Sequence, residues 1–193
     1  MSVMSGRRGL MESLKAEGVR YLFGNPGSSE LPIMEELERH PELDYVLVMQ
    51  EGVGMGMADA LARVTGKPSF VSLHIETGLA NGISLLHNAN QGSTPLVLSS
   101  ANRDIRQLAQ GRTDLAGMVR QFTKFAAEVT HPDQVSSIMR RAFNEARTPP
   151  MGPTFVGFSA NALDGMADLE IGGSVTGCYR VPPDRSAIED AVR

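Results

Sequence analysis

Residues 44–64 read DYVLVMQEGVGMGMADALARV, and this stretch decides the fold. Its first part, Asp44 to Met49, is a short apolar run typical of a buried strand. Its last part, from Gly52 to about Thr65, has the small and apolar residues of a packed helix. Glu51 stands between the two. A carboxylate at such a junction lies at the carboxyl end of a strand, the edge of an open α/β sheet where ligands bind. An acid there can also simply favour the start of a helix, so position alone leaves both interpretations open.

The same alternation of strand and helix continues on both sides of this stretch. Apolar runs at 19–23, 68–73, 95–100 and 153–158 predict further strands. The predicted helices cover residues 5–16, 30–39, 52–65, 78–90 and 132–146. Residues 122–129 form either a strand or an irregular buried stretch, and residues 101–117 are predicted to be a loop. Alternating strands and helices predict an α/β fold, a three-layer, doubly wound, mostly parallel sheet with helices on both faces.

Composition excludes several classes of function. The 193 residues have a net charge of −4 and no basic run, so no electrostatic signature of nucleic-acid binding is present. No apolar run is long enough for a membrane span, and the N-terminus lacks the apolar segment of a secretory signal. Cys178 is the only cysteine; it can form no internal disulfide and has no recognisable base for a nucleophilic role. We expect a cytoplasmic protein without nucleic-acid or membrane partners.

Three loops each follow a predicted strand and should meet at the carboxyl edge of the sheet. They are Gly24–Ser29, Gln50–Gly52 and His74–Gly78. The first lacks the ending of a P-loop and the glycine spacing of a dinucleotide fingerprint, so by itself it is best interpreted as a turn. His74 is either a structural residue or a proton-transfer group, and Glu76 is either a helix-start acid or part of the rim. The four histidines are scattered, which gives no metal set, and a serine-hydrolase elbow is absent.

An ordered set of short motifs resembles the thiamine-diphosphate-dependent decarboxylase and acetolactate synthase family, over residues 5 to about 160. The matching segments are Phe23–Pro32, Gln50–Gly52, Met57–Pro68, Leu73–His74, Gly78–Gly82 and Thr94–Val97. The resemblance is to the N-terminal, pyrimidine-binding domain and implies its flavodoxin-like topology. Gly24-Asn-Pro-Gly-Ser28 and Leu73-His74 are most similar to the benzoylformate decarboxylase branch. Acetolactate synthases usually carry a Ser-Gly-Pro-Gly run where this chain has His74 to Gly78.

The resemblance implies a role for Glu51. It matches the glutamate that hydrogen-bonds N1′ of the cofactor's aminopyrimidine and so favours the imino tautomer. The exocyclic nitrogen of that tautomer takes the proton from the thiazolium C2 and gives the ylid. The cofactor supplies the carbanion chemistry and the protein supplies orientation and proton management. A carboxylate buried beside an aromatic ring is expected to have a raised pKa.

The resemblance implies roles for further residues at the same edge. His74 matches an active-site histidine that handles protons on the bound intermediates, and Ser28 matches a serine that contacts the substrate carboxylate. With Glu51 they form the predicted catalytic set. The remaining predicted cofactor contacts are Asn25, Pro26, Gly27, Gly78 and Asn81. Glu76 has no clear counterpart.

The family's diphosphate and Mg²⁺ are held by a separate domain through a Gly-Asp-Gly motif, which this sequence lacks. In the family, the cofactor lies between the pyrimidine domain of one subunit and the diphosphate domain of another. We therefore expect half a site here, no metal ligands, and a homodimer or homotetramer. Residues 1–165 are predicted to be the pyrimidine-binding domain, and residues 166–193, which end in the start of a helix at Ser186, a linker into a middle domain absent from this chain.

The leading prediction is the pyrimidine-binding half of an enzyme that decarboxylates a 2-oxo acid, inactive when isolated and without a flavin. Three alternatives stay open: an acetolactate synthase-like carboligase, a natural small subunit of a two-subunit decarboxylase, and a non-catalytic binding module of the same fold. The small residues and methionines of the helices after Glu51 and after His74 indicate helices buried within the chain or packed against another subunit, with equal support for each.

Overall fold

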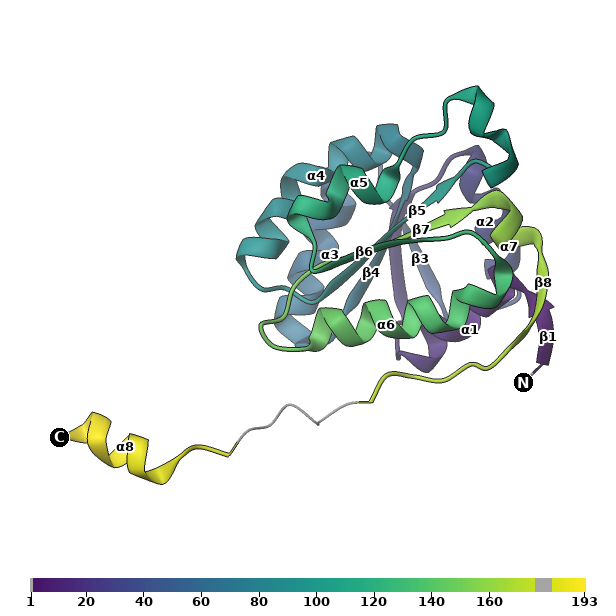
Figure 1. The fold of residues 1–193 in the computed structure, drawn as a ribbon. Helices are drawn as coiled ribbons and strands as arrows, with labels where there is room; N and C mark the ends of the chain where they lie inside the picture. The colour runs from purple at the N-terminus through teal and green to yellow at the C-terminus, as the bar shows by residue number, and fades with distance from the viewer. Residues whose placement is uncertain (1, 176–181) are drawn as a thin grey trace.

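A computed structural model describes residues 2–175 and 182–193, so the prediction for Cys178 lies outside the described residues. Six parallel strands form the main sheet in the order β3-β2-β4-β5-β7-β6 (Figure 1). The strands are β2 (Tyr21–Asn25), β3 (Asp44–Leu47), β4 (Ser69–His74), β5 (Leu96–Asn102), β6 (Phe125–Val129) and β7 (Thr154–Ser159). β4, β5 and β7 are almost completely buried, which explains their nearly continuous apolar sequences.

Helices cover both faces of this sheet (Figure 1). One face packs against α1 (Gly6–Ala16), α2 (Leu31–Leu37) and α6 (Val135–Arg147), and the other against α3 (Glu51–Thr65), α4 (Ile75–Gln91) and α5 (Leu115–Val119). Successive side chains of a strand point to opposite faces of the sheet: Phe70 packs in the core under α1 and α6, whereas Val71 packs in the core under α3 and α4. The predicted three-layer, doubly wound fold is confirmed.

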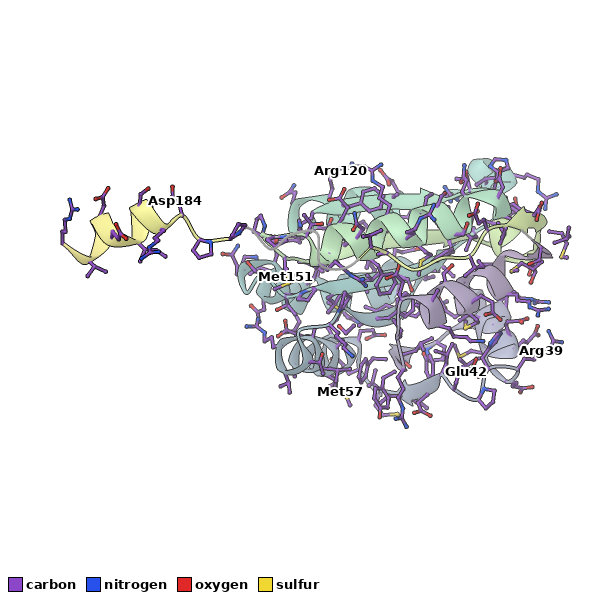
Figure 2. The ribbon with its side chains drawn as sticks, turned by 90° about the horizontal axis from the view of Figure 1, so that it is seen from below. Arg39, Glu42, Met57, Arg120, Met151 and Asp184 are labelled. Atoms are coloured by element: carbon purple, nitrogen blue, oxygen red, sulfur yellow. The ribbon has the colours of Figure 1, made fainter. Side chains whose placement is uncertain are left out.

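A small antiparallel pair lies beside the main sheet, in which β1 (Ser2–Ser5) pairs with β8 (Met166–Leu169). The sequence did not predict it, because strands of four residues carry too little alternation to be recognised. The shorter helical elements are η1 (Ser28–Glu30), η2 (Ile105–Gln110), η3 (Arg120–Phe122), η4 (Pro132–Gln134) and α7 (Ala160–Asp164). The predicted C-terminal helix is present as α8 (Arg185–Val192); it buries no residue, and Figure 2 shows Asp184 at its start, away from the body of the protein.

Three local predictions need correction. The predicted loop at 101–117 contains η2 and the start of α5, because Asp114 caps α5 by accepting a hydrogen bond from the backbone N–H of Gly117. α4 begins at Ile75 rather than Gly78. Gly24 is not in a turn but inside β2. Residues 122–129, which were left open, form a strand from Phe125.

The strand order places a topological switch point beside β2. The chain passes from β2 to β3 on one side of it and then to β4 on the other. The segments that leave the carboxyl ends of β2 and β4 therefore diverge, and that divergence is where open α/β sheets bind ligands. Asn25 ends β2 and His74 ends β4.

Candidate active site

Glu51 is the first residue of α3 and lies at this edge of the sheet, 8% exposed. Gln50 caps the helix, since its side chain accepts a hydrogen bond from the backbone N–H of Val53. Two amides hold the Glu51 carboxylate: Asn25 Nδ2 donates to Oε1 at 3.0 Å, and Asn81 Nδ2 donates to Oε2 at 3.0 Å. Three segments far apart in sequence thus fix one carboxylate.

The electrostatics of Glu51 differ from the prediction. Burial is the largest single influence and raises its pKa, but hydrogen bonds from its own backbone, from Asn25 and from Asn81, together with the charge of His74, outweigh it. The pKa of Glu51 is therefore lowered from its ordinary value; a raised pKa was expected for this carboxylate beside an aromatic ring, whereas its neighbours here are Asn25, Asn81 and His74. The amides stabilise the ionised form, the form that can accept a proton at neutral pH.

Replacement of Asn81 is expected to raise the pKa of Glu51, because Asn81→Ala removes one of the donors that stabilise the carboxylate. The loss of this partly exposed hydrogen bond should cost about 0.5–1 kcal/mol of stability. Titration of the Glu51 side-chain carbonyl by ¹³C NMR measures the first effect. Asn88→Ala, an exposed position on the same helix, is the matched control and should leave Glu51 unchanged. An unmoved titration in Asn81→Ala would contradict the role of this amide.

His74 ends β4, and its ring pairs with a carboxylate that sequence reasoning missed. His74 Nδ1 lies 2.7 Å from Oε2 of Glu30, the last residue of η1, whose side chain is completely buried. Glu30 also accepts hydrogen bonds from the backbone N–H groups of Gly27, at 3.1 Å, and Ala101, at 3.1 Å. A carboxylate at Nδ1 holds the proton of a neutral ring on that nitrogen and leaves Nε2 as an acceptor.

Glu30 was predicted only as the first residue of a helix. Burial is the main influence on it and raises its pKa, although His74, Gly27 and Ala101 oppose this by favouring the ionised form. The signal that could have found it is its position, an acid soon after the end of a strand at the ligand-binding edge, as for Glu51.

Two glycines allow these groups to approach one another. A Cβ at Gly27 would overlap the His74 ring, and a Cβ at Gly78 would lie 3.4 Å from Oε1 of Glu51 and 3.6 Å from Cβ of His74. Gly27 therefore lies against the His74 ring, and Gly78 lies against both Glu51 and His74. Ile75, directly after His74, has a φ of 35°, an uncommon conformation for a β-branched residue. Strain of this kind costs about 1–3 kcal/mol and is concentrated at functional sites.

The remaining predicted residues lie along the same edge. Ser28 is exposed at the start of η1, two residues before Glu30, and Pro26 is half-buried between Asn25 and Gly27. Glu76 is half-buried, with its carboxylate 3.9 Å from the guanidinium of Arg103. The structure thus brings Asn25, Glu51 and Asn81 into contact, and joins Gly27 to His74 through Glu30.

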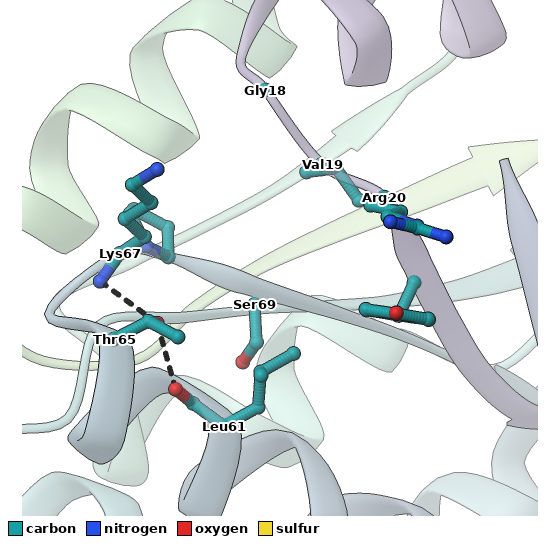
Figure 3. Close-up of a pocket in the computed structure, with 9 residues that line it drawn as sticks. Gly18, Val19, Arg20, Leu61, Thr65, Lys67 and Ser69 are labelled. Atoms are coloured by element: carbon teal, nitrogen blue, oxygen red, sulfur yellow. Dashed lines mark hydrogen bonds between the residues drawn. The ribbon is translucent and has the colours of Figure 1, made fainter. Parts of the chain in front are cut away.

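A small cavity lies at the opposite, amino edge of the sheet (Figure 3). Its volume is about 150 Å³, and Tyr21, Leu61 and Ser69 are among its lining residues. These residues lie at or near the starts of β2 and β4 and the end of α3, so the cavity is separate from the Glu51 edge. In residues 2–175 and 182–193, no group of three or more His, Cys, Asp or Glu side chains could hold a metal ion.

α3 has two different faces. Met55, Ala58 and Ala62 are completely buried against the sheet and α4. Met49, before the helix, is 91% exposed and Met57 is 41% exposed; Figure 2 shows Met57 at the outer surface. The sequence left open whether this helix is buried within the chain or faces a partner. The structure buries one side and leaves apolar side chains exposed on the other.

Comparison with known proteins identifies relatives. Residues 4–123 match the family model described as thiamine pyrophosphate enzyme, N-terminal TPP binding domain. Benzoylformate decarboxylase from Pseudomonas aeruginosa is 31% identical over 150 residues, which are 75% of this chain and 28% of the relative. Acetolactate synthase isozyme 3 large subunit from Escherichia coli is 31% identical over 167 residues, 85% of this chain and 29% of the relative.

A solved structure extends the similarity to nearly the whole chain. The crystal structure of benzoylformate decarboxylase from Polynucleobacter necessarius superimposes with a TM-score of 0.85 and 25% identity, covering 97% of this chain and 35% of that one. This chain therefore spans between a quarter and two fifths of the length of these relatives.

Proposed function

Because the chain belongs to the thiamine pyrophosphate enzyme family and carries its N-terminal cofactor-binding domain, we propose that it is the pyrimidine-binding half of a 2-oxo-acid decarboxylase. The observation that supports this most is the Glu51 carboxylate, held at the carboxyl edge by Asn25 and Asn81. Thiamine pyrophosphate, also called thiamine diphosphate, would supply a carbon nucleophile and a positively charged thiazolium ring that takes up the electron pair released when carbon dioxide leaves.

The residues of the edge fit the pyrimidine part of this cofactor. Each Glu51 oxygen accepts a hydrogen bond from one side-chain amide, and a carboxylate oxygen can accept a second hydrogen bond. The missing side chain of Gly78 leaves Oε1 accessible from that side. We propose that Glu51 exchanges a proton with the ring nitrogen, while Asn25, Pro26, Gly27, Gly78 and Asn81 orient the ring.

The substrate side of the site is proposed to be His74 and Ser28. Nε2 of His74 is free to take or return a proton, because Glu30 occupies Nδ1. The exposed Ser28 hydroxyl can donate to a substrate carboxylate. A carboxylate beside a carbonyl is what a 2-oxo acid presents, and benzoylformate, named in two of the relatives, is of this class.

An acetolactate synthase-like carboligase is the second candidate, because relatives with that name match as much of the chain. The His74–Glu30 pair favours decarboxylation, since it places a proton-transfer group where the synthases usually carry a Ser-Gly-Pro-Gly run. A small subunit and a non-catalytic module of the same fold stay as further alternatives. The reading frame beyond Arg193 distinguishes a subunit from a longer protein.

The partner is proposed to be the diphosphate-binding domain of another subunit in a homodimer or homotetramer, and that domain is proposed to hold Mg²⁺. The exposed apolar side chains of Met49 and Val53, two residues before and two residues after Glu51, support an interface near this edge. We also propose residues 1–165 as the functional domain, residues 166–193 as the linker, and a cytoplasmic location. No helix in the described part of the chain has the length and hydropathy needed to cross a membrane.

Cofactor binding tests whether the chain is half of a site. Isothermal titration of the 193-residue chain with thiamine diphosphate and Mg²⁺ should give a Kd weaker than about 10⁻⁶ M, because the proposed diphosphate ligands are elsewhere. Submicromolar binding by this chain alone would refute the proposal that the cofactor site is divided between two domains.

The activity itself is tested by assaying the assembled enzyme, with the diphosphate-binding part present, against a panel of 2-oxo acids. Carbon dioxide release should require both parts, and its absence with every acid would refute the decarboxylase.

A further inference from the structure

A row of hydroxyl groups lies inside the protein, directly beneath the Glu30–His74 pair. Gly24 of β2 is the register partner of Ser72 on β4, and Ser72 is the partner of Ser99 on β5. Register partners on parallel neighbours point to the same face of the sheet. Phe70, two residues before Ser72, belongs to the core under α1 and α6, so this row faces the same layer.

Tyr45 completes the row from the edge strand β3. A Cβ at Gly24 would overlap the Tyr45 hydroxyl, which therefore reaches across β2 at the one position that lacks a side chain. A Cβ at this position would also overlap the backbone carbonyl oxygen of Ser72, so the neighbouring strand and the Tyr45 hydroxyl together explain the glycine inside β2.

These three hydroxyls are without partners in the described part of the chain. Tyr45 Oη, Ser72 Oγ and Ser99 Oγ are buried, and none of them hydrogen-bonds to another described residue. Most buried polar atoms in proteins are satisfied, and a buried hydroxyl without a partner costs about 1–3 kcal/mol. Buried waters typically bridge groups of this kind.

The next layer toward the edge of the sheet contains the candidate catalytic pair. His74 is two residues after Ser72, and Ala101 is two residues after Ser99, so both point to the same face as the row. Glu30 joins them through Oε2 to the His74 ring and through Oε1 to the Ala101 N–H. The titratable groups that face Glu30 are His74 from β4 and Tyr45 from β3; burial, and to a lesser extent the Glu30 charge, raise the pKa of Tyr45.

We propose that Tyr45 is a positioning residue: its hydroxyl, with Ser72 and Ser99, orders internal water that donates to Glu30 and keeps that carboxylate ionised against the His74 ring. The inference rests on the proposed function of the pair. Burial alone would drive Glu30 to take the proton from His74, which would reverse the roles of the two ring nitrogens. Hydrogen bonds supplied from the hydroxyl row oppose that transfer.

Tyr45→Phe in the 193-residue chain tests the proposal, read by ¹³C NMR titration of Glu30 and by chemical denaturation. The pH midpoint of the Glu30 carboxyl should rise further, and the unfolded fraction should increase about tenfold, the effect of one lost buried hydrogen bond. Tyr21→Phe is the matched control, because Tyr21 is the other half-buried tyrosine among the described residues and packs on the opposite core. An unchanged pH midpoint for Glu30 would overturn the proposal. A Tyr45→Phe chain with a higher free energy of unfolding would also overturn it, because removal of a buried hydroxyl that has no hydrogen-bond partner stabilises the folded state.

Ser99→Ala is the second variant, in case Tyr45→Phe fails to fold. It should raise the pH midpoint of the Glu30 carboxyl as well, and an unchanged midpoint would again overturn the proposal. In the assembled enzyme, Tyr45→Phe should move the acidic limb of the pH–rate profile, with kcat affected more than KM. The NMR result does not depend on the cofactor. If Tyr45→Phe shifts the pH midpoint of Glu30 but the assembled enzyme releases no carbon dioxide, the proposed function is refuted and this inference still holds.

Discussion

Glu51→Ala is expected to lower kcat of the assembled enzyme by roughly 10²–10⁴-fold, the range for loss of a positioned acid–base group. The carboxylate is held from both sides, with Asn25 on Oε1 and Asn81 on Oε2. The buried carboxylate of Glu30 is not placed to replace it, because Glu30 is directed at His74 and Ala101. Glu51→Gln should retain a hydrogen bond but lose proton exchange, and Glu51→Asp should be impaired because it is one methylene shorter.

Glu76→Gln provides the control for Glu51. Glu76 lies in the first turn of α4 at the same rim, but its carboxylate is 3.9 Å from Arg103 rather than among the amides that hold Glu51. It should keep activity within a few-fold of the unmodified enzyme. Activity of Glu51→Ala equal to that of the unmodified enzyme would favour a non-catalytic module. Circular dichroism of each variant separates loss of chemistry from loss of fold.

The sequence predicted what depends on local order along the chain. A strand that ends just before an acid and a helix places Glu51 at the binding edge, and the same reasoning places His74 and Gly27 there. The sheet and both helical layers followed from the alternation of strands and helices, which the structure confirms.

The contacts that the sequence did not predict are those between distant segments. Glu30 meets His74 across 44 positions and Ala101 across 71, so neither contact leaves a periodic signal. Gly24 was interpreted as part of a turn because the groups that require its small size, the Ser72 carbonyl and the Tyr45 hydroxyl, come from other strands. Similarly, the pKa of Glu51 was predicted to be raised because burial was expected, whereas the Asn81 amide that opposes this effect comes from α4.

Glu30→Gln is expected to lower kcat of the assembled enzyme by roughly 10²–10³-fold while the chain stays folded. The amide nitrogen of glutamine can only donate, so a glutamine that donates to Nδ1 moves the ring proton to Nε2. The histidine then presents a donor where the proposed mechanism needs an acceptor. This is a change of tautomer rather than of shape, and a shifted pH–rate profile together with a lowered kcat is its expected signature.

Glu30→Gln should also remove one contribution to the pH dependence of the free energy of unfolding. The pKa of Glu30 is raised in the folded protein, so the folded state keeps this proton at pH values where the unfolded chain has lost it. The resulting stabilisation is complete below the ordinary value of 4.5 and is lost as the pH rises through the folded value. Chemical denaturation across this range should show the decline in the unmodified chain and not in Glu30→Gln.

Glu36→Gln separates the role of the pair from the general effect of a buried acid beside a histidine. Glu36 is 2% exposed in α2, with Oε1 3.5 Å from Nε2 of His40 and Oε2 bonded to Arg39, and it lies away from the Glu51 edge. Its replacement should reduce stability and leave kcat unchanged. If Glu36→Gln and Glu30→Gln lower kcat equally, the effect of Glu30 is structural and His74 needs no partner to hold its tautomer. If only Glu30→Gln lowers kcat, the carboxylate acts through His74, because Glu30 is completely buried and can reach a substrate only through that ring.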